Sequence, residues 1–213
     1  MGVVERERAG WRALTVEGRH LRITVMPERG AELQELTLLA REVDVLFKAP
    51  WGFRGPGDPP LEGSGGEPFL ERYAGGWQEL FPSSNDPCTF RGRAIPFHGE
   101  VAAIPWQVEP LAAGDGVVCT VDCPVSPFRL VREIRLADDR PALEWTSTAT
   151  NTGDDEEPCT FGHHLVFGPP FIEAGCRFDC GATTITTIPE MWEDTARLEP
   201  GQSSPWPHAR LRA

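Results

Sequence analysis

Short runs of alternating apolar and polar residues recur along the chain. Leu21–Met26 reads LRITVM, and a period of two is typical of a strand with one buried face. Beyond residue 106 the pattern returns, with turn-forming Gly, Asp and Pro residues between the runs. These later runs are Trp106–Pro110, Gly116–Asp122, Phe128–Leu136 and Leu143–Ala149. The pattern predicts a series of short strands.

Weaker patterns assign the remaining segments. Strands are expected at Leu36–Leu39, Val43–Phe47, Cys159–Phe167, Cys176–Cys180 and Ala182–Ile188. Residues 31–41 fit either a strand or a short helix, and residues 189–198 are the one late helical candidate. Residues 51–66 read WGFRGPGDPPLEGSGG, and this density of Gly and Pro excludes regular structure.

The composition supports an all-β protein. The chain has 213 residues, of which 40% are hydrophobic, and this is enough for one large domain with a buried core. Its 22 glycines and 21 prolines favour a turn-rich fold over a helical bundle. We therefore expect an all-β fold, a large antiparallel β-sandwich, in a single domain that covers residues 1–213.

The charge and the N-terminus limit the partners and the location. A net charge of −12 argues against nucleic acid and against an anionic membrane surface as partners. The chain begins MGVVERERAGW, which has no apolar core of signal-peptide length, and no later run is long enough for a membrane helix. A cytoplasmic location is therefore expected.

The six cysteines are expected to be reduced thiols, because the chain is not small enough to depend on disulfides. Cys119 and Cys123, like Cys176 and Cys180, are separated by three residues. On a strand this spacing puts the two sulfurs about 13 Å apart, which is too far for them to share a metal ion. No metal site and no cofactor are expected.

Two stretches concentrate the groups that could carry chemistry. Gly75–Trp106 contains His98 between Phe97 and Gly99, and Asn151–Gly168 contains His163 and His164. Adjacent side chains on a strand point to opposite faces, so at most one of this pair can face a given cavity. The alternative is that one histidine is a hydrogen-bonded core residue and the other is solvated.

Trp77, Gln78 and Glu79 form a mixed apolar and hydrogen-bonding set. Sugars bind to such sets, because an aromatic face packs on the C–H side of the ring while amides and carboxylates bind the hydroxyl groups. The alternative is a core tryptophan, which is the commoner role in a β protein. The set makes a sugar a candidate ligand.

Three motifs together resemble the aldose 1-epimerase (galactose mutarotase-like) family. They are GGWQELFP, PFHGEV followed by PW, and TNTGDDEEPCTFGHHLVFG, in the family's order and rough spacing. The resemblance implies a galactose mutarotase-like supersandwich with a sugar site in its concave face, and interconversion of the α and β anomers of an aldose. It implies that His164 is the catalytic acid on the ring oxygen and that His98 binds and polarises the sugar. Trp77, Gln78, Glu79 and His163 are the expected substrate-binding residues.

One departure from the family pattern affects the expected activity. The family's catalytic glutamate lies on strands that would follow Trp206, so the resemblance predicts a sandwich that is incomplete at its C-terminus and an epimerase that lacks its usual base. Glu100, Glu173, Glu190 and Glu193 are carboxylates that could replace it. Missing strands would expose sheet edges, which leaves a homodimer open. The alternative functions are a non-catalytic carbohydrate-binding protein and a structural or interaction protein of the same fold.

Overall fold

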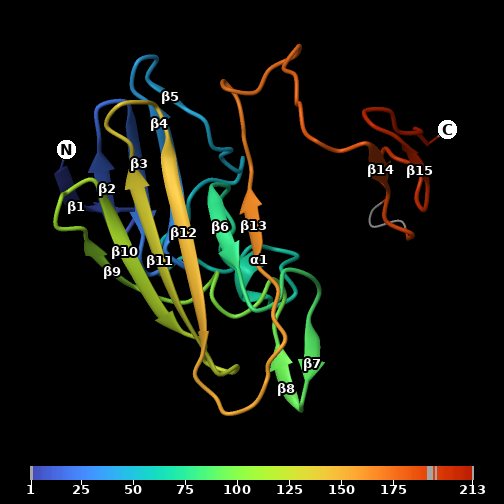
Figure 1. Ribbon diagram of the computed structural model, residues 1–213, viewed down its shortest axis with the longest axis horizontal. Coiled ribbons are helices and arrows are strands. Elements are labelled where there is room, and N and C mark those ends of the chain that lie inside the picture. The colour runs from blue at the N-terminus through green and yellow to red at the C-terminus, as the bar shows by residue number, and fades with distance from the viewer. Residues whose placement is uncertain (1, 191–193, 195, 213) are drawn as a thin grey trace. The chain divides into compact units, whose positions relative to one another are not determined.

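The computed structural model describes residues 2–190, 194 and 196–212. The chain divides into two compact units, Met1–Glu173 and Ala174–Ala213, each of which is described by itself. The described part of the first unit contains a seven-stranded, a four-stranded and a two-stranded sheet, and that of the second contains a two-stranded sheet (Figure 1). Within the described residues, no helix has the length and apolar character that crossing a bilayer requires.

The larger sheet of the first unit has seven strands in the order β1-β2-β3-β4-β6-β13, with β5 paired to β4. Its strands are β1 Gly2–Arg8, β2 Trp11–Glu17, β3 Leu21–Met26, β4 Glu32–Leu38, β5 Val43–Asp44, β6 Trp77–Leu80 and β13 Gly162–Leu165. All of the pairs are antiparallel. The strand expected at Leu21–Met26 is confirmed, and residues 32–38 form a strand rather than a helix.

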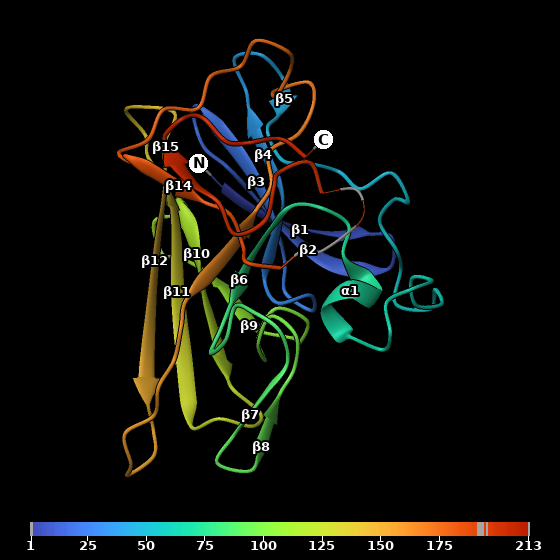
Figure 2. The ribbon, with the colours of Figure 1, turned by 90° about the vertical axis from the view of Figure 1, so that its right-hand side faces the viewer.

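The smaller sheet has the order β12-β11-β10-β9, so strands that are neighbours in sequence pair as hairpins (Figure 2). Its strands are β9 Gln107–Pro110, β10 Gly116–Asp122, β11 Phe128–Leu136 and β12 Leu143–Asn151. These are the four runs that the alternating pattern predicts, with small differences at their ends. Strand β11 shows the pattern clearly, because its buried and exposed positions alternate over nine residues.

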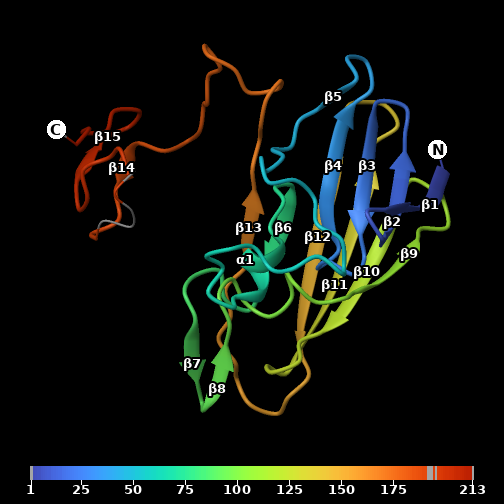
Figure 3. The ribbon, with the colours of Figure 1, turned by 180° about the vertical axis from the view of Figure 1, so that it is seen from behind.

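The two sheets pack face to face, as Figures 1 and 3 show. One cluster of buried side chains joins them, with Ile23 and Leu33 from the larger sheet and Val117, Leu130 and Ile134 from the smaller one. Burial of apolar area at about 25 cal/mol per Å² is the main stabilising contribution to such a core. The expected all-β antiparallel sandwich is confirmed.

Shorter elements complete the first unit. Helix α1, Pro68–Arg72, begins with a proline at its first turn, where the missing N–H costs no hydrogen bond. Strands β7, Cys88–Phe90, and β8, Arg93–Ile95, form a separate hairpin. Neither α1, nor the edge strand β1, nor its neighbour β2 was predicted from the sequence.

The second unit corrects one expectation. The described strands are β14, Thr184–Thr186, and β15, Ser203–Pro205, which pair with each other. The strand expected over Cys176–Cys180 is wrong, because that segment is exposed and irregular. An alternating run becomes a strand only where another strand pairs with its backbone. The helix expected over residues 189–198 falls partly on residues outside the described ones.

Candidate functional site

Strands β6 and β13 bring together the two stretches that the sequence singles out. His163 lies opposite Glu79 and His164 lies opposite Gln78 in this antiparallel pair. Residues that are directly opposite point to the same face of a sheet, while neighbours along a strand point to opposite faces. His164 and Gln78 therefore share one face, and His163 and Glu79 share the other.

On the first of these faces, His164 lies in a cluster of rings. Its ring centroid is 5.3 Å from Phe69, 5.0 Å from Tyr73 and 5.8 Å from His98. We call Phe69, Tyr73, His98 and His164 the histidine cluster. Phe69 belongs to α1 and Tyr73 follows it directly, so this short helix supplies the aromatic wall beside the two imidazoles.

A tight turn fixes the ring of His98. His98 and Gly99 both have positive φ angles, 62° and 82°. The N–H of His98 donates to the carbonyl of Asn85 at 3.0 Å, and its ring stacks on Phe97 with centroids 3.8 Å apart. The edge of the same ring meets Phe69 at 4.7 Å. The imidazole is therefore held in one orientation beside His164.

Replacing Gly99 by alanine should destabilise this turn. A Cβ atom at Gly99 would lie 2.4 Å from the carbonyl oxygen of Phe81, whereas a Cβ atom at Gly92 would meet nothing within 4 Å. Both glycines have positive φ, so both substitutions carry a strain of about 1–2 kcal/mol. We expect Gly99→Ala to lower the free energy of unfolding by at least about 2 kcal/mol more than Gly92→Ala, because the clash adds to the strain. Urea denaturation of both variants measures this, and equal losses would contradict the role of the turn.

Burial determines the charge state of both imidazoles. It lowers the pKa of His164, and it is also the largest cause of the lowered pKa of His98, followed by the charge of His164. The carbonyls of Ser84 and Asn85 partly offset the shift at His98. The Nδ1 atoms of both rings are buried, and among the described residues neither has a hydrogen-bond partner. Both rings are mainly neutral at pH 7, so each offers one donor and one acceptor.

The same shifts predict how stability depends on pH. The pKa values of His98, His163 and His164 are all lowered by burial, so the unfolded chain binds more protons than the folded chain below about pH 6.5. The free energy of unfolding should therefore fall as the pH drops from 7.5 to 5.5. Thermal unfolding by circular dichroism measures this, and His98→Gln should make the dependence shallower. A Tm that stays constant or rises on acidification would contradict the prediction.

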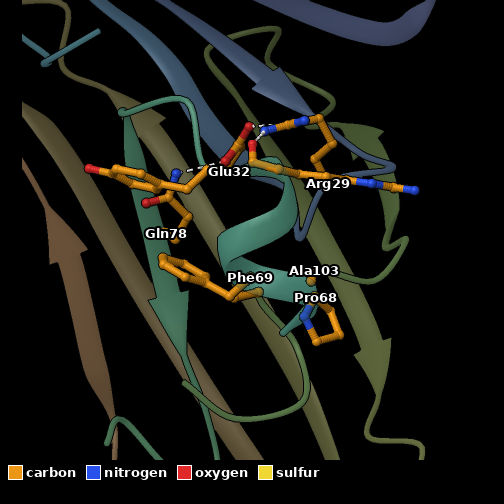
Figure 4. Close-up of a pocket in the computed structure, with 9 residues that line it drawn as sticks. Arg29, Glu32, Pro68, Phe69, Gln78 and Ala103 are labelled. Carbon is orange, nitrogen blue, oxygen red and sulfur yellow. Dashed lines mark hydrogen bonds and ion pairs between the residues drawn. The ribbon is translucent and has the colours of Figure 1, made fainter. Parts of the chain in front are cut away.

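A small pocket adjoins the histidine cluster (Figure 4). Its lining residues are Arg29, Glu32, Pro68, Phe69, Arg72, Tyr73, Gln78, Ala102 and Ala103. Gln78 Nε2 donates to Glu32 Oε2 at 2.6 Å, and Arg29 Nε donates to Glu32 Oε1 at 2.7 Å. The pocket shares Phe69 and Tyr73 with the histidine cluster, so the two form one continuous site.

Arg29 and Glu32 were not singled out from the sequence. Glu28–Gly30 has the composition of a turn, and the alternation of Glu32, Leu33 and Gln34 is that of an ordinary half-exposed strand. In the structure these polar side chains are buried, with 4%, 3% and 1% exposure at Arg29, Glu32 and Gln34. A buried polar face on a strand often belongs to a site, but the one-dimensional pattern cannot distinguish it from a solvated face.

The remaining predicted residues lie on the other face of β6 and β13. The indole N–H of Trp77 donates to His163 Nδ1 at 3.1 Å, and its ring stacks on Trp145 with centroids 4.5 Å apart. Glu79 is fully buried and is ion-paired with Arg132 at 2.7 Å. Of the six residues expected at the site, the structure brings together His98, His164 and Gln78, and it places Trp77, Glu79 and His163 on the side that faces the smaller sheet.

Two of the six cysteines, Cys119 and Cys123, have buried thiols. In the part of the chain that the structure describes, no three His, Cys, Asp or Glu side chains gather as metal ligands. Burial raises the pKa of Cys119 to about 11 and that of Cys123 to about 12, so both thiols stay protonated at neutral pH. Both cysteines lie in the core cluster between the two sheets.

The fold defines a class, the galactose mutarotase-like β-sandwich. A proposed aldose 1-epimerase from Klebsiella pneumoniae superposes with a TM-score of 0.62 at 20% identity, over 86% of this chain and 50% of that one. The Slr1438 protein from Synechocystis sp. superposes with a TM-score of 0.59 at 21% identity, over 95% of this chain and 67% of that one. A galactose mutarotase-like protein from Clostridium acetobutylicum superposes with a TM-score of 0.55 at 17% identity, over 98% of this chain and 64% of that one. At these identities the likeness shows the fold, and the chain spans between half and two thirds of the length of these structures.

The chain belongs to the family of the domain of unknown function DUF4432, whose family model matches residues 8–201. A search of curated protein sequences finds no match.

Proposed function

We propose that this protein binds an aldose at the histidine cluster and interconverts its α and β anomers. Opening a hemiacetal requires that a proton leaves the C1 hydroxyl while another reaches the ring oxygen. His164 is the acid that protonates the ring oxygen, and His98 binds the sugar and polarises it. The observation that carries the proposal is the meeting of these two imidazoles, from stretches far apart in sequence, at 5.8 Å in a partly buried aromatic site.

The surroundings of the two rings suit a sugar. Phe69 and Tyr73 offer apolar faces to the C–H side of a pyranose, and the amide of Gln78 can bind a hydroxyl group. The Nδ1 atoms of His98 and His164 have no partner among the residues that the structure describes, and sugar hydroxyl groups or the ring oxygen can satisfy them as donors or acceptors. Trp77, Glu79 and His163 support the site from the opposite face of the sheet.

Anomer exchange measured by two-dimensional NMR tests the proposal directly. Purified α-glucose and α-galactose equilibrate slowly in water, and the full chain should accelerate the exchange between their α and β signals at neutral pH. Saturation-transfer difference spectra of the same samples report binding. A folded chain that leaves the exchange at the spontaneous rate for both sugars and for their phosphates would overturn the proposal.

A second candidate function is carbohydrate binding without turnover. The hydrogen bonding of Glu32, the carboxylate that lines the pocket, favours this function. Glu32 already accepts hydrogen bonds from Arg29 and Gln78, so its oxygens are partly occupied. Binding seen by saturation transfer, together with exchange at the spontaneous rate, would support this function over catalysis.

A further inference from the structure

The proposed reaction needs a group that takes the proton from the C1 hydroxyl. The sequence suggests several carboxylates, of which Glu100 has another role within the first unit. The carboxylate of Glu100 accepts hydrogen bonds from the backbone N–H groups of Val125 at 2.6 Å and Ser126 at 3.1 Å. It is therefore already bound to the loop that contains these two residues. Glu190 belongs to the second unit, and Glu193 lies outside the described residues. Among the described residues that line the pocket, Glu32 is the one carboxylate.

Strand geometry directs Glu32 to the same face as His164. Leu33 pairs with Trp77 and belongs to the core between the sheets, so its neighbour Glu32 points to the opposite side. Gln78 points the same way, and its amide donates to Glu32 at 2.6 Å. Because Gln78 also lies opposite His164 in the β6–β13 pair, Glu32, Gln78 and His164 form a row across three strands.

Tyr73 links the two ends of this row. Its ring lies 5.0 Å from that of His164, and it lines the same pocket as Glu32. Burial, and then the negative charge of Glu32, raises the pKa of Tyr73. The negative charge of Glu32 is therefore felt at Tyr73, beside the position proposed for the sugar.

We propose that Glu32 is the catalytic base of the anomer exchange, an inference that rests on the proposed function. Its carboxylate takes the proton of the C1 hydroxyl, and that O–H electron pair forms the C1=O bond. The C1–O5 bond breaks with its electron pair on O5, which takes a proton from the protonated form of His164, the minor form of this ring at pH 7. The products are the open-chain aldehyde, protonated Glu32 and neutral His164. Reclosure on the other face of the aldehyde reverses both transfers and restores both residues.

The existing contacts of Glu32 leave room for this role. Each carboxylate oxygen accepts more than one hydrogen bond, so Arg29 and Gln78 use only part of its capacity. The same two contacts fix the orientation of the carboxylate, as a base on a rigid strand requires.

Two matched substitutions on β4 test the inference by NMR anomer exchange with glucose and galactose. Glu32→Gln should reduce the exchange rate by about 100-fold or more while binding is retained, because it keeps the size and polarity of the side chain but removes the base. Glu35→Gln is the control on the same strand. Glu35 is paired with Arg8 and accepts from Thr24, outside the pocket, so the rate should stay within twofold. Formate should restore part of the rate to Glu32→Ala.

The outcomes separate this inference from the proposed function. If the unmodified chain is active and His164→Ala is inactive but Glu32→Gln keeps its rate, Glu32 is not the base and the proposed function stands. If the unmodified chain shows no exchange, both fail. If Glu32→Gln does not fold, Glu32→Asp decides, because it retains the pair with Arg29 but withdraws the carboxylate by one methylene. A loss of at least tenfold would then support the inference, and an unchanged rate would overturn it.

Discussion

Replacing His164 by alanine should remove the acceleration of anomer exchange while the chain stays folded. General acid catalysis contributes about 10²–10⁴-fold in rate, so the loss should be of that size. The side chain is half-buried and its Nδ1 makes no hydrogen bond within the described part of the chain, so the fold does not depend on a bond from that atom. Exchange spectroscopy at pH 7 measures the rate, and circular dichroism checks the fold.

His163→Ala is the matched control, because it removes the adjacent imidazole from the opposite face of the same strand. His163 accepts the indole N–H of Trp77 and lies beside Trp145 at 5.3 Å, away from the histidine cluster. The variant should keep the exchange rate within about tenfold of the unmodified chain, since no group that is proposed to bind or react is lost. Equal losses in the two variants, or a loss only in His163→Ala, would refute the assignment of the acid.

Replacing Glu79 by alanine should be among the most destabilising single changes in the protein. Glu79 and Arg132 form an ion pair at 2.7 Å, and both side chains have no exposed surface. Removing one partner leaves the other charge buried and unpaired, which typically costs about 3–5 kcal/mol. The guanidinium cannot move out easily, because it is held between Trp106 and Trp145 at 4.1 and 4.5 Å from their rings. Urea denaturation measures the free energy of unfolding.

Two further variants give this prediction its controls. The double variant Glu79→Leu with Arg132→Met should recover most of the loss, because it removes both charges and keeps the volume apolar. Asp122→Asn breaks an exposed ion pair with Arg129 and should leave the unfolding curve unchanged. A Glu79→Ala variant that is as stable as the unmodified chain would show that water or another group compensates the Arg132 charge.

Much of the fold could be predicted because the strands of the smaller sheet each bury one face. Strand β11 needs an apolar residue at every second position to contribute Leu130 and Ile134 to the core, and this requirement is visible in the sequence. Edge strand β1 was missed because it buries little and reads GVVERER. Helix α1 is five residues long, which is too short for a helical period to appear.

The candidate site was predicted in part. The histidines were found because they are rare and lie in two unusual loop-rich stretches, and the alternation rule stated that only one of His163 and His164 could face a cavity. The rule could not say which. Glu79 was expected at the site as part of the mixed set Trp77, Gln78 and Glu79, and the structure places it in the interior beside Arg132. Glu32 was missed because its alternation with Leu33 matches that of a strand with a solvated face.

The sequence by itself determined strand β3 and the four strands of the smaller sheet, most of the turns between those four, and the histidines that could carry chemistry. Only the tertiary structure decided that His164 joins His98, that Gln78 connects it to Glu32, and that Trp77, Glu79 and His163 face the smaller sheet. The physical reason is that alternation along a strand is local and divides residues into two faces. Which of those faces meets the core and which meets α1 depends on pairing and packing with segments far away in the chain, and these contacts leave no periodic mark in the sequence.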